Sequence, residues 1–127
     1  MGLDCYACHS LQDGELTPQE QAAFEQADIH LCGGLASGDG SDGSFRGKVY
    51  ATHIEEITGV SLYQEFIPPE VVKQMYTSLL DCQPSDVIEA MDHEGINLNH
   101  LTANDILELR KFFKVCAECN LGLAGWW

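Results

Sequence analysis

Residues 2–9, "GLDCYACH", and residues 123–127, "LAGWW", decide the fold that the sequence predicts. The first segment is too short for a stable helix, and it places Leu3, Cys5 and Ala7 on one side of an extended chain. This two-residue alternation is typical of a strand. The closing segment follows the longest expected helix and can form a final strand. We therefore predict a helix-rich α+β fold with a small sheet on which the N-terminal and C-terminal strands can pair.

Capping residues mark the helices expected between these two segments. Thr17 is a good N-cap, Pro18 suits the first helical position, and Glu20 completes a capping box. Ser44 is expected to cap a helix that runs to Thr58. Further helices are predicted from the Pro pair at 68–69 to about residue 82, from 84 to 95, and over about 103–119. Residues 28–32 are expected to form a short strand or extended segment.

The length and charge of the chain limit its organisation and its partners. Its 127 residues fit a single globular domain, 1–127, and its 20 acidic and 6 basic residues give a formal charge of −14. This charge disfavours direct binding to nucleic acid or to an anionic membrane. It permits cationic protein partners, or an acidic inhibitor that mimics nucleic acid. No secretion signal or membrane span is apparent, so a cytoplasmic location is expected.

A glycine-rich stretch, "CGGLASGDGSDGSFRGKVY" (32–50), is the strongest candidate site. The expected order is strand, glycine-rich turn and helix N-terminus, which would direct main-chain N–H groups at an anion. Arg46 supplies a planar fork of donors and Lys48 a mobile charge. The prediction is a site for a small phosphate- or carboxylate-bearing ligand, or for an acidic patch on a partner. Its predicted residues are Gly33, Gly34, Gly43, Ser44, Phe45, Arg46, Gly47, Lys48 and Tyr50. In the simpler alternative this is a surface loop whose two cations pair with the chain's own carboxylates.

Enzyme motifs are not recognisable in this stretch. A nucleotide-binding P-loop is rejected because one residue is missing between Gly43 and Gly47, and because Val49 stands where a hydroxyl should bind magnesium. The three-residue spacing of Asp39 and Asp42 does not fit a calcium loop. No nucleophile and base are paired by spacing, so no catalytic residue is assigned. We expect a non-enzymatic binding protein without a cofactor.

The cysteines carry the main alternative, a structural zinc site. Two Cys-x-x-Cys pairs, Cys5 with Cys8 and Cys116 with Cys119, could supply four thiolates. Against this, Cys5 and Cys8 would point to opposite faces of a strand, and the second pair lies on the apolar stripe of the last helix. Packing in the core is therefore an equally good explanation for the presence of these cysteines. A reversible disulfide between the pairs is a further alternative. Haem attachment at "CYACH" would require export, which no signal indicates.

One histidine and the final pair of tryptophans also lead to predictions. His53 shares an apolar helix face with Ile54 and Ile57, so we expect a hydrogen-bonded core histidine rather than a base. The final pair, Trp126 and Trp127, either docks into the fold or anchors a partner. We favour docking, with one indole in the core.

Three short segments resemble a group of small proteins. They are the opening "MGLDCY", the stretch "GSFRGKVY" (43–50) and the closing "LGLAGWW" (121–127). All are similar to parts of small uncharacterised bacterial and phage proteins that begin M-G-L-D-x-Y. This resemblance implies no activity.

Overall fold

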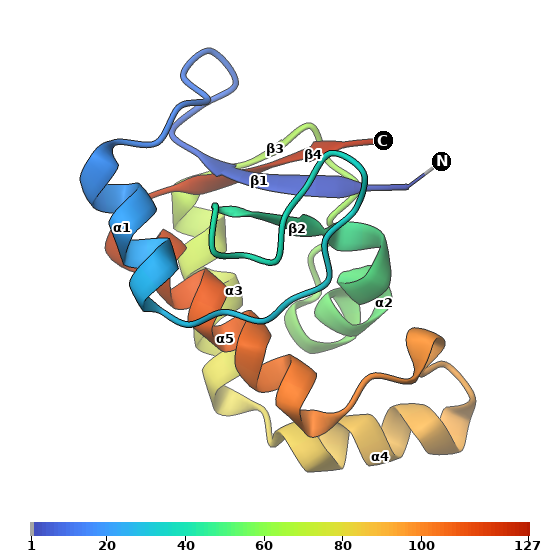
Figure 1. Ribbon diagram of the computed structural model, residues 1–127. Coiled ribbons are helices and arrows are strands. Elements are labelled where there is room, and N and C mark those ends of the chain that lie inside the picture. Colours follow the sequence, from blue (N-terminus) through green and yellow to red (C-terminus); the bar gives the residue numbers. More distant parts are fainter. Residues whose placement is uncertain (1) are drawn as a thin grey trace.

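The computed structural model describes residues 2–127 and has the expected α+β fold (Figure 1). A small antiparallel sheet lies on one side of a group of helices. The strands are β1 (Asp4–Cys8), β2 (Ser44–Arg46), β3 (Phe66–Ile67) and β4 (Gly122–Trp126). The helices are α1 (Pro18–Gln26), α2 (Gly47–Thr58), α3 (Pro69–Asp81), α4 (Pro84–Glu94) and α5 (Ala103–Glu118), with a 3₁₀ turn, η1 (Leu98–His100), before α5.

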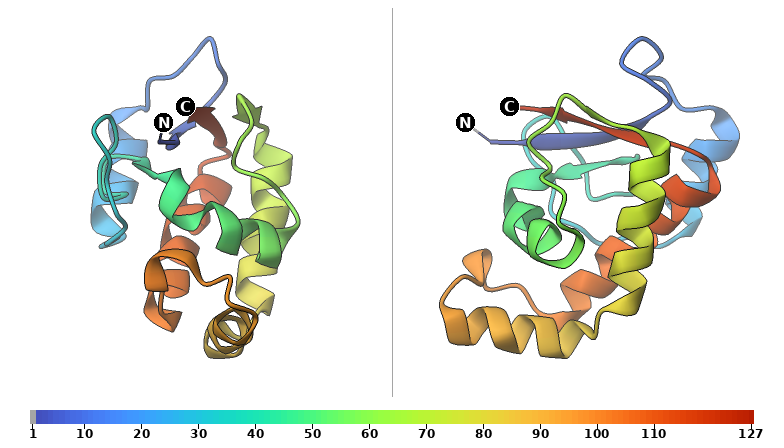
Figure 2. Two further views of the ribbon diagram at one scale, coloured as in Figure 1. Left: turned by 90° about the vertical axis from the view of Figure 1, so that its right-hand side faces the viewer. Right: turned by 180° about the vertical axis from the view of Figure 1, so that it is seen from behind.

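The predicted pairing of the two chain ends is confirmed. The strand order is β2-β1-β4-β3, so β1 and β4 form the centre of the sheet. Asp4 lies opposite Arg46 of β2 on one side and opposite Trp126 of β4 on the other. The two ends of the chain consequently lie side by side at one end of the sheet (Figures 1 and 2).

One face of the sheet packs on the helices, which lie below it in Figure 1. Burial of Leu3, Cys5 and Ala7 matches the expected alternation along β1. The ring of Phe112 on α5 is central to this core. Its centroid lies 4.8 Å from that of Phe45, 5.1 Å from that of Phe24 and 6.0 Å from that of Phe113. These contacts join β2, α1 and α5 around a few large rings.

Most helix boundaries follow the predicted caps. The Thr17 hydroxyl accepts a hydrogen bond from the N–H of Glu20 (3.2 Å), and the Glu20 carboxylate accepts one from the N–H of Thr17 (2.8 Å). Gly59 and Gly95 end α2 and α4 with φ of 76° and 73°. That left-handed conformation is accessible to glycine at little cost.

The prediction that Ser44 caps a helix is wrong. Residues 44–46 form strand β2, and α2 begins only at Gly47. The Ser44 hydroxyl is used inside the preceding loop, where it accepts from the N–H of Gly38 (2.9 Å) and donates to Asp42 (2.8 Å). Pairing with β1 thus prevails over the local capping signal.

Residues 28–32 form no strand; Asp28 lies in a turn with φ of 56°, and the residues after it pack against the core. Ile29 and Leu31 are buried, and the N–H of His30 donates to the buried Glu108 carboxylate (2.6 Å). The same carboxylate forms a 2.9 Å ion pair with Lys111. A hydrogen bond to a side chain of α5 therefore holds this segment. The strand that was one of the two expected arrangements does not form.

We expect Gly47→Ala to lower the free energy of unfolding by about 1–3 kcal/mol, because the site has no room for a methyl group. A Cβ at this position would lie 2.5 Å from the Cys5 Sγ and 3.0 Å from a Leu3 methyl group. Gly14→Ala is the matched control, since nothing lies within 4 Å of a Cβ there. Urea denaturation of both variants measures the difference, and equal stabilities would contradict this packing.

Candidate functional site

The glycine-rich loop directs many of its polar groups at itself. The N–H of Gly34 donates to the Ser37 carbonyl (3.1 Å), and the N–H of Gly43 donates to the Gly40 carbonyl (3.1 Å). At the junction with α2, the N–H of Lys48 donates to the Leu3 carbonyl (3.2 Å). The loop also leads into β2 rather than directly into a helix. The expected arrangement, a glycine turn at a helix N-terminus that receives an anion, is therefore not the one formed.

Several residues of the predicted site belong to the core or to tight packing. Phe45 is 0% exposed, and its ring contacts that of Tyr50, which is 1% exposed. The Tyr50 hydroxyl accepts from the N–H of Cys32 (2.8 Å). Neither ring has a free face for a ligand. Gly43, Ser44 and Gly47 are buried as well, so the site described next is built without these five residues.

A pocket of about 710 Å³ lies where the loop meets the chain ends, and we call it the end-of-sheet pocket. It brings together three predicted residues, Gly33, Gly34 and Arg46, while Lys48 is exposed and outside the lining. The volume is within the range of roughly 300–1,000 Å³ typical of ligand sites. The complete lining is Gly2, Asp4, Gly33, Gly34, Leu35, Ala36, Arg46, Trp126 and Trp127.

Sheet register positions the charged wall of this pocket. Arg46, Asp4 and Trp126 are directly opposite one another on three adjacent strands, so their side chains leave the same face of the sheet. The loop packs beside this row through two hydrogen bonds. The Ser37 hydroxyl donates to the Asp4 Oδ1 (2.5 Å), and the Tyr6 hydroxyl donates to the Ala36 carbonyl (2.5 Å). Burial, together with the charge of Asp4, raises the pKa of Tyr6. Like an ordinary tyrosine, this phenol is protonated and can donate at neutral pH.

Unused hydrogen-bond donors line the same pocket. Within residues 2–127, the Arg46 guanidinium forms no ion pair or hydrogen bond with another side chain or backbone group. The N–H groups of Gly33, Leu35 and Ala36 likewise donate to no other described residue. The alternative in which Arg46 pairs with one of the chain's own carboxylates is therefore not formed among residues 2–127. Within this described part of the chain, four donor groups that line the pocket have no partner.

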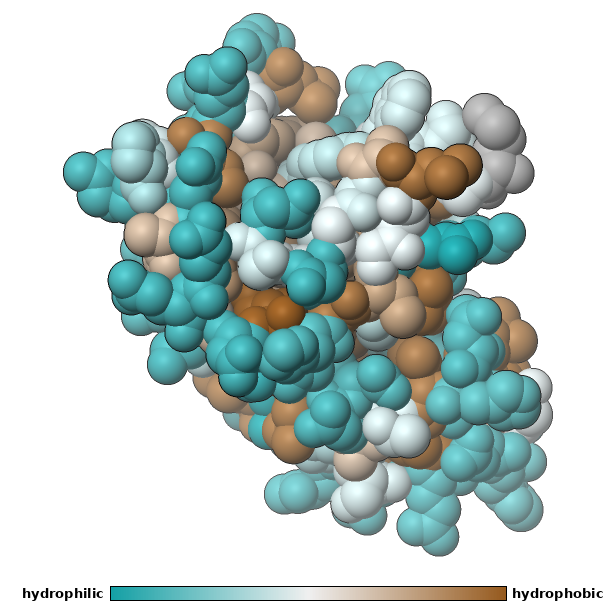
Figure 3. Space-filling view, in the orientation of Figure 1, coloured by the Kyte–Doolittle hydropathy of each residue, from teal (hydrophilic) through white to brown (hydrophobic). Residues whose placement is uncertain are grey.

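The two final tryptophans form the apolar wall, and the prediction that one indole docks in the core is wrong. Trp126 is 66% exposed and Trp127 48% exposed, with Leu35 also exposed nearby. The Trp127 ring contacts that of Tyr63 edge-on, with centroids 5.7 Å apart. Figure 3 shows apolar surface near the chain ends, within a largely hydrophilic face. Exposed aromatic surface of this kind often marks a binding site.

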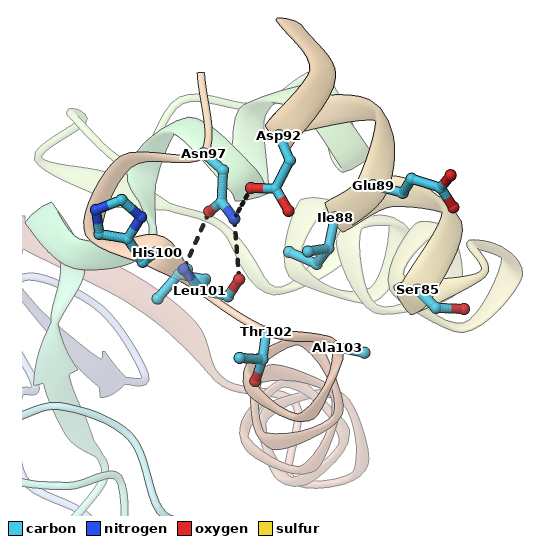
Figure 4. A pocket seen from close by; sticks show the side chains of 9 residues that line it. All are labelled: Ser85, Ile88, Glu89, Asp92, Asn97, His100, Leu101, Thr102 and Ala103. Carbon is cyan, nitrogen blue, oxygen red and sulfur yellow. Dashed lines mark hydrogen bonds between the residues drawn. The ribbon is translucent and has the colours of Figure 1, made fainter. Parts of the chain in front are cut away.

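A second hollow, of about 480 Å³, lies between α4 and the start of α5 (Figure 4). Asn97 lies beside it and donates to Asp92 (2.6 Å) and to the Leu101 carbonyl (2.9 Å). Its Oδ1 accepts from the Leu101 N–H (3.0 Å) and is 2.7 Å from the Nε2 of His53. His53 is fully buried, as predicted for a core histidine. Because both ends of the Asn97 side-chain amide are used internally, its place here is structural.

The zinc alternative gains no support from the structure. Among residues 2–127, no three His, Cys, Asp or Glu side chains are arranged to hold a metal ion. Cys5 and Cys8 lie three positions apart on β1, which directs them to opposite faces. Burial, with Asp4 adding, raises the pKa of Cys5 to about 12, and burial also raises the pKa of Cys116. These protonated thiols are core residues.

Comparison of the chain with protein-family models, curated proteins and solved structures finds no match. In the part of the chain from Gly2 onward, no helix is long and apolar enough to cross a membrane.

Thiol exposure predicts an order of chemical labelling. Cys32 is the exposed cysteine of the described chain, whereas Cys5, Cys8 and Cys116 are buried. We expect iodoacetamide to modify Cys32 first in the folded protein and the three buried thiols only after unfolding. Peptide mass spectrometry over a time course measures this order. Early labelling of Cys5 or Cys116 would contradict the described core.

Proposed function

We propose that this protein is a non-enzymatic binding protein whose end-of-sheet pocket holds a small ligand with an anionic group and a flat apolar body. The observation that carries the proposal is the Arg46 guanidinium, which has no partner among residues 2–127 and shares one pocket with two exposed indoles. A ligand with both features would use both walls. An ion without an apolar body would leave the indoles uncovered.

Each wall has a distinct role in this proposal. Arg46 presents a fork of N–H donors that matches the two oxygens of a carboxylate, and the free amides of Gly33, Leu35 and Ala36 add donors nearby. The indoles of Trp126 and Trp127 offer faces or edges against which a planar group can pack. Asp4 also lines the pocket, and its charge repels a second negative charge on the ligand. A carboxylate therefore fits better than a phosphate dianion.

We predict that indole-3-propionate raises the melting temperature of the protein, because it carries both features. Propionate alone and 3-methylindole alone should give much smaller shifts at the same concentration, since each uses one wall. Binding to the folded state stabilises it by RT ln(1 + c/Kd), where c is the free ligand concentration, so thermal-shift titration at equal concentrations ranks the three compounds by affinity.

Arg46→Ala should weaken the binding of indole-3-propionate by about tenfold or more, because the lost hydrogen bonds are to a charged group. Lys48→Ala is the matched control: it removes the same charge two residues away, from a side chain outside the pocket. We expect this variant to bind as the wild type does. Equal losses in the two variants, or none in either, would contradict the proposal.

A further inference from the structure

The end-of-sheet pocket carries two opposite charges, and this restricts its ligand further. Asp4 and Arg46 are directly opposite each other on neighbouring strands and line the same pocket. Residues so placed have Cβ atoms about 4.5–5.5 Å apart. Yet, in the structure of residues 2–127, the two side chains form no ion pair with each other. The Arg46 and Asp4 side chains are thus neighbours in the pocket and, among residues 2–127, are not joined by a direct ion pair.

From this arrangement we infer that the ligand is a free α-amino acid with an aromatic or large apolar side chain. Its carboxylate binds Arg46, its ammonium group binds Asp4, and its side chain packs on the tryptophans. The two charged groups of an α-amino acid are attached to one carbon, which suits two neighbouring receptors of opposite charge. The inference rests on the proposed function, because it uses the same pocket and the same role for Arg46.

The Asp4 carboxylate is held in place for such a contact. Its Oδ1 accepts a hydrogen bond from the Ser37 hydroxyl, whereas its Oδ2 accepts none from any residue between Gly2 and Trp127. The loop packs closely beside it. A Cβ at Gly34 would lie 2.6 Å from that Oδ1, 3.2 Å from the Ser37 hydroxyl oxygen and 3.5 Å from the Arg46 Cγ. Glycine at position 34 therefore lets the loop approach both charged side chains without filling the space over them.

Charge repulsion supplies the selectivity. A ligand with a carboxylate alone binds Arg46 but places a negative charge close to Asp4. A ligand with an amine alone binds Asp4 but places a positive charge close to Arg46. Only a ligand with both groups satisfies both side chains. A charged group of the pocket that loses its water without gaining a partner also lowers the affinity. This cost adds to the difference between a ligand with both charges and a ligand with one.

Three indole compounds test the inference. L-Tryptophan carries both charges, indole-3-propionate only the carboxylate, and tryptamine only the ammonium group. Isothermal titration calorimetry with the wild-type protein should show L-tryptophan binding about tenfold more tightly than either of the others. A tenfold difference in affinity corresponds to the free energy of about one charge-assisted hydrogen bond. Indole-3-propionate should still bind in an Arg46-dependent way.

Asp4→Asn should remove the advantage of L-tryptophan over indole-3-propionate. The amide oxygen of asparagine can keep the bond from Ser37, so the loop should stay in place. Asp13→Asn is the matched control, because it makes the same charge change at an exposed position outside the pocket. It should leave the advantage intact. Thermal unfolding of both variants checks that they fold.

The outcomes separate the inference from the proposed function. If indole-3-propionate binds through Arg46 but L-tryptophan binds no more tightly in the wild type, the amino-acid ligand is wrong and the proposed function stands. An advantage of L-tryptophan that persists in Asp4→Asn also overturns the inference. If none of the three compounds binds the wild type, both fail.

Discussion

The antiparallel pairing of β1 with β4 is the contact on which the rest of the structure depends. It joins the two ends of the chain at the centre of the sheet, and it sets Asp4 opposite Trp126 and Cys5 opposite Gly125. A shift of one residue would turn every side chain of β4 to the other face. The end-of-sheet pocket would then lose Trp126, and the core would lose Leu123. Fold and site are therefore fixed by the same register.

The polar groups of the glycine-rich loop are divided between structure and site. Hydrogen bonds inside the loop and with β1 fix its path, and Ser44, Asp42 and Gly38 are used in this way. Among the described residues, the amides of Gly33, Leu35 and Ala36 and the side chain of Arg46 donate to no other group, and all four residues line the end-of-sheet pocket. An exposed cation that has no partner among residues 2–127, next to exposed aromatic rings, has no evident role in stability.

Much of the fold could be predicted from local signals. The capping box at Thr17 and the left-handed glycines at 59 and 95 define helix ends with contacts that depend on nearby residues alone. Strand β2 could not be predicted in this way. Ser44 has the chemistry of a helix cap, and only the presence of β1 beside it makes residues 44–46 a strand.

The candidate site was predictable in part. Gly33, Gly34 and Arg46 line the pocket, and the sequence pointed to them because glycines free backbone amides and Arg46 offers a fork of donors. Lys48 was predicted with them, but it lies outside the lining. Asp4 was missed, and the tryptophans were not connected to the loop, because their proximity comes from strand register. The expected docking of an indole assumed that an apolar chain end is buried. Here the register of β4 sets Trp126 opposite Asp4, where its side chain stays exposed.

Backbone NMR during titration with indole-3-propionate tests binding at the end-of-sheet pocket. We expect the amide signals of Gly33, Leu35 and Ala36 and the two indole N–H signals to move together and to saturate at one ligand concentration. Signals of α4, which is remote from this pocket, should stay in place (Figure 2). Saturable movement of other signals, with these five unchanged, would contradict binding at this pocket.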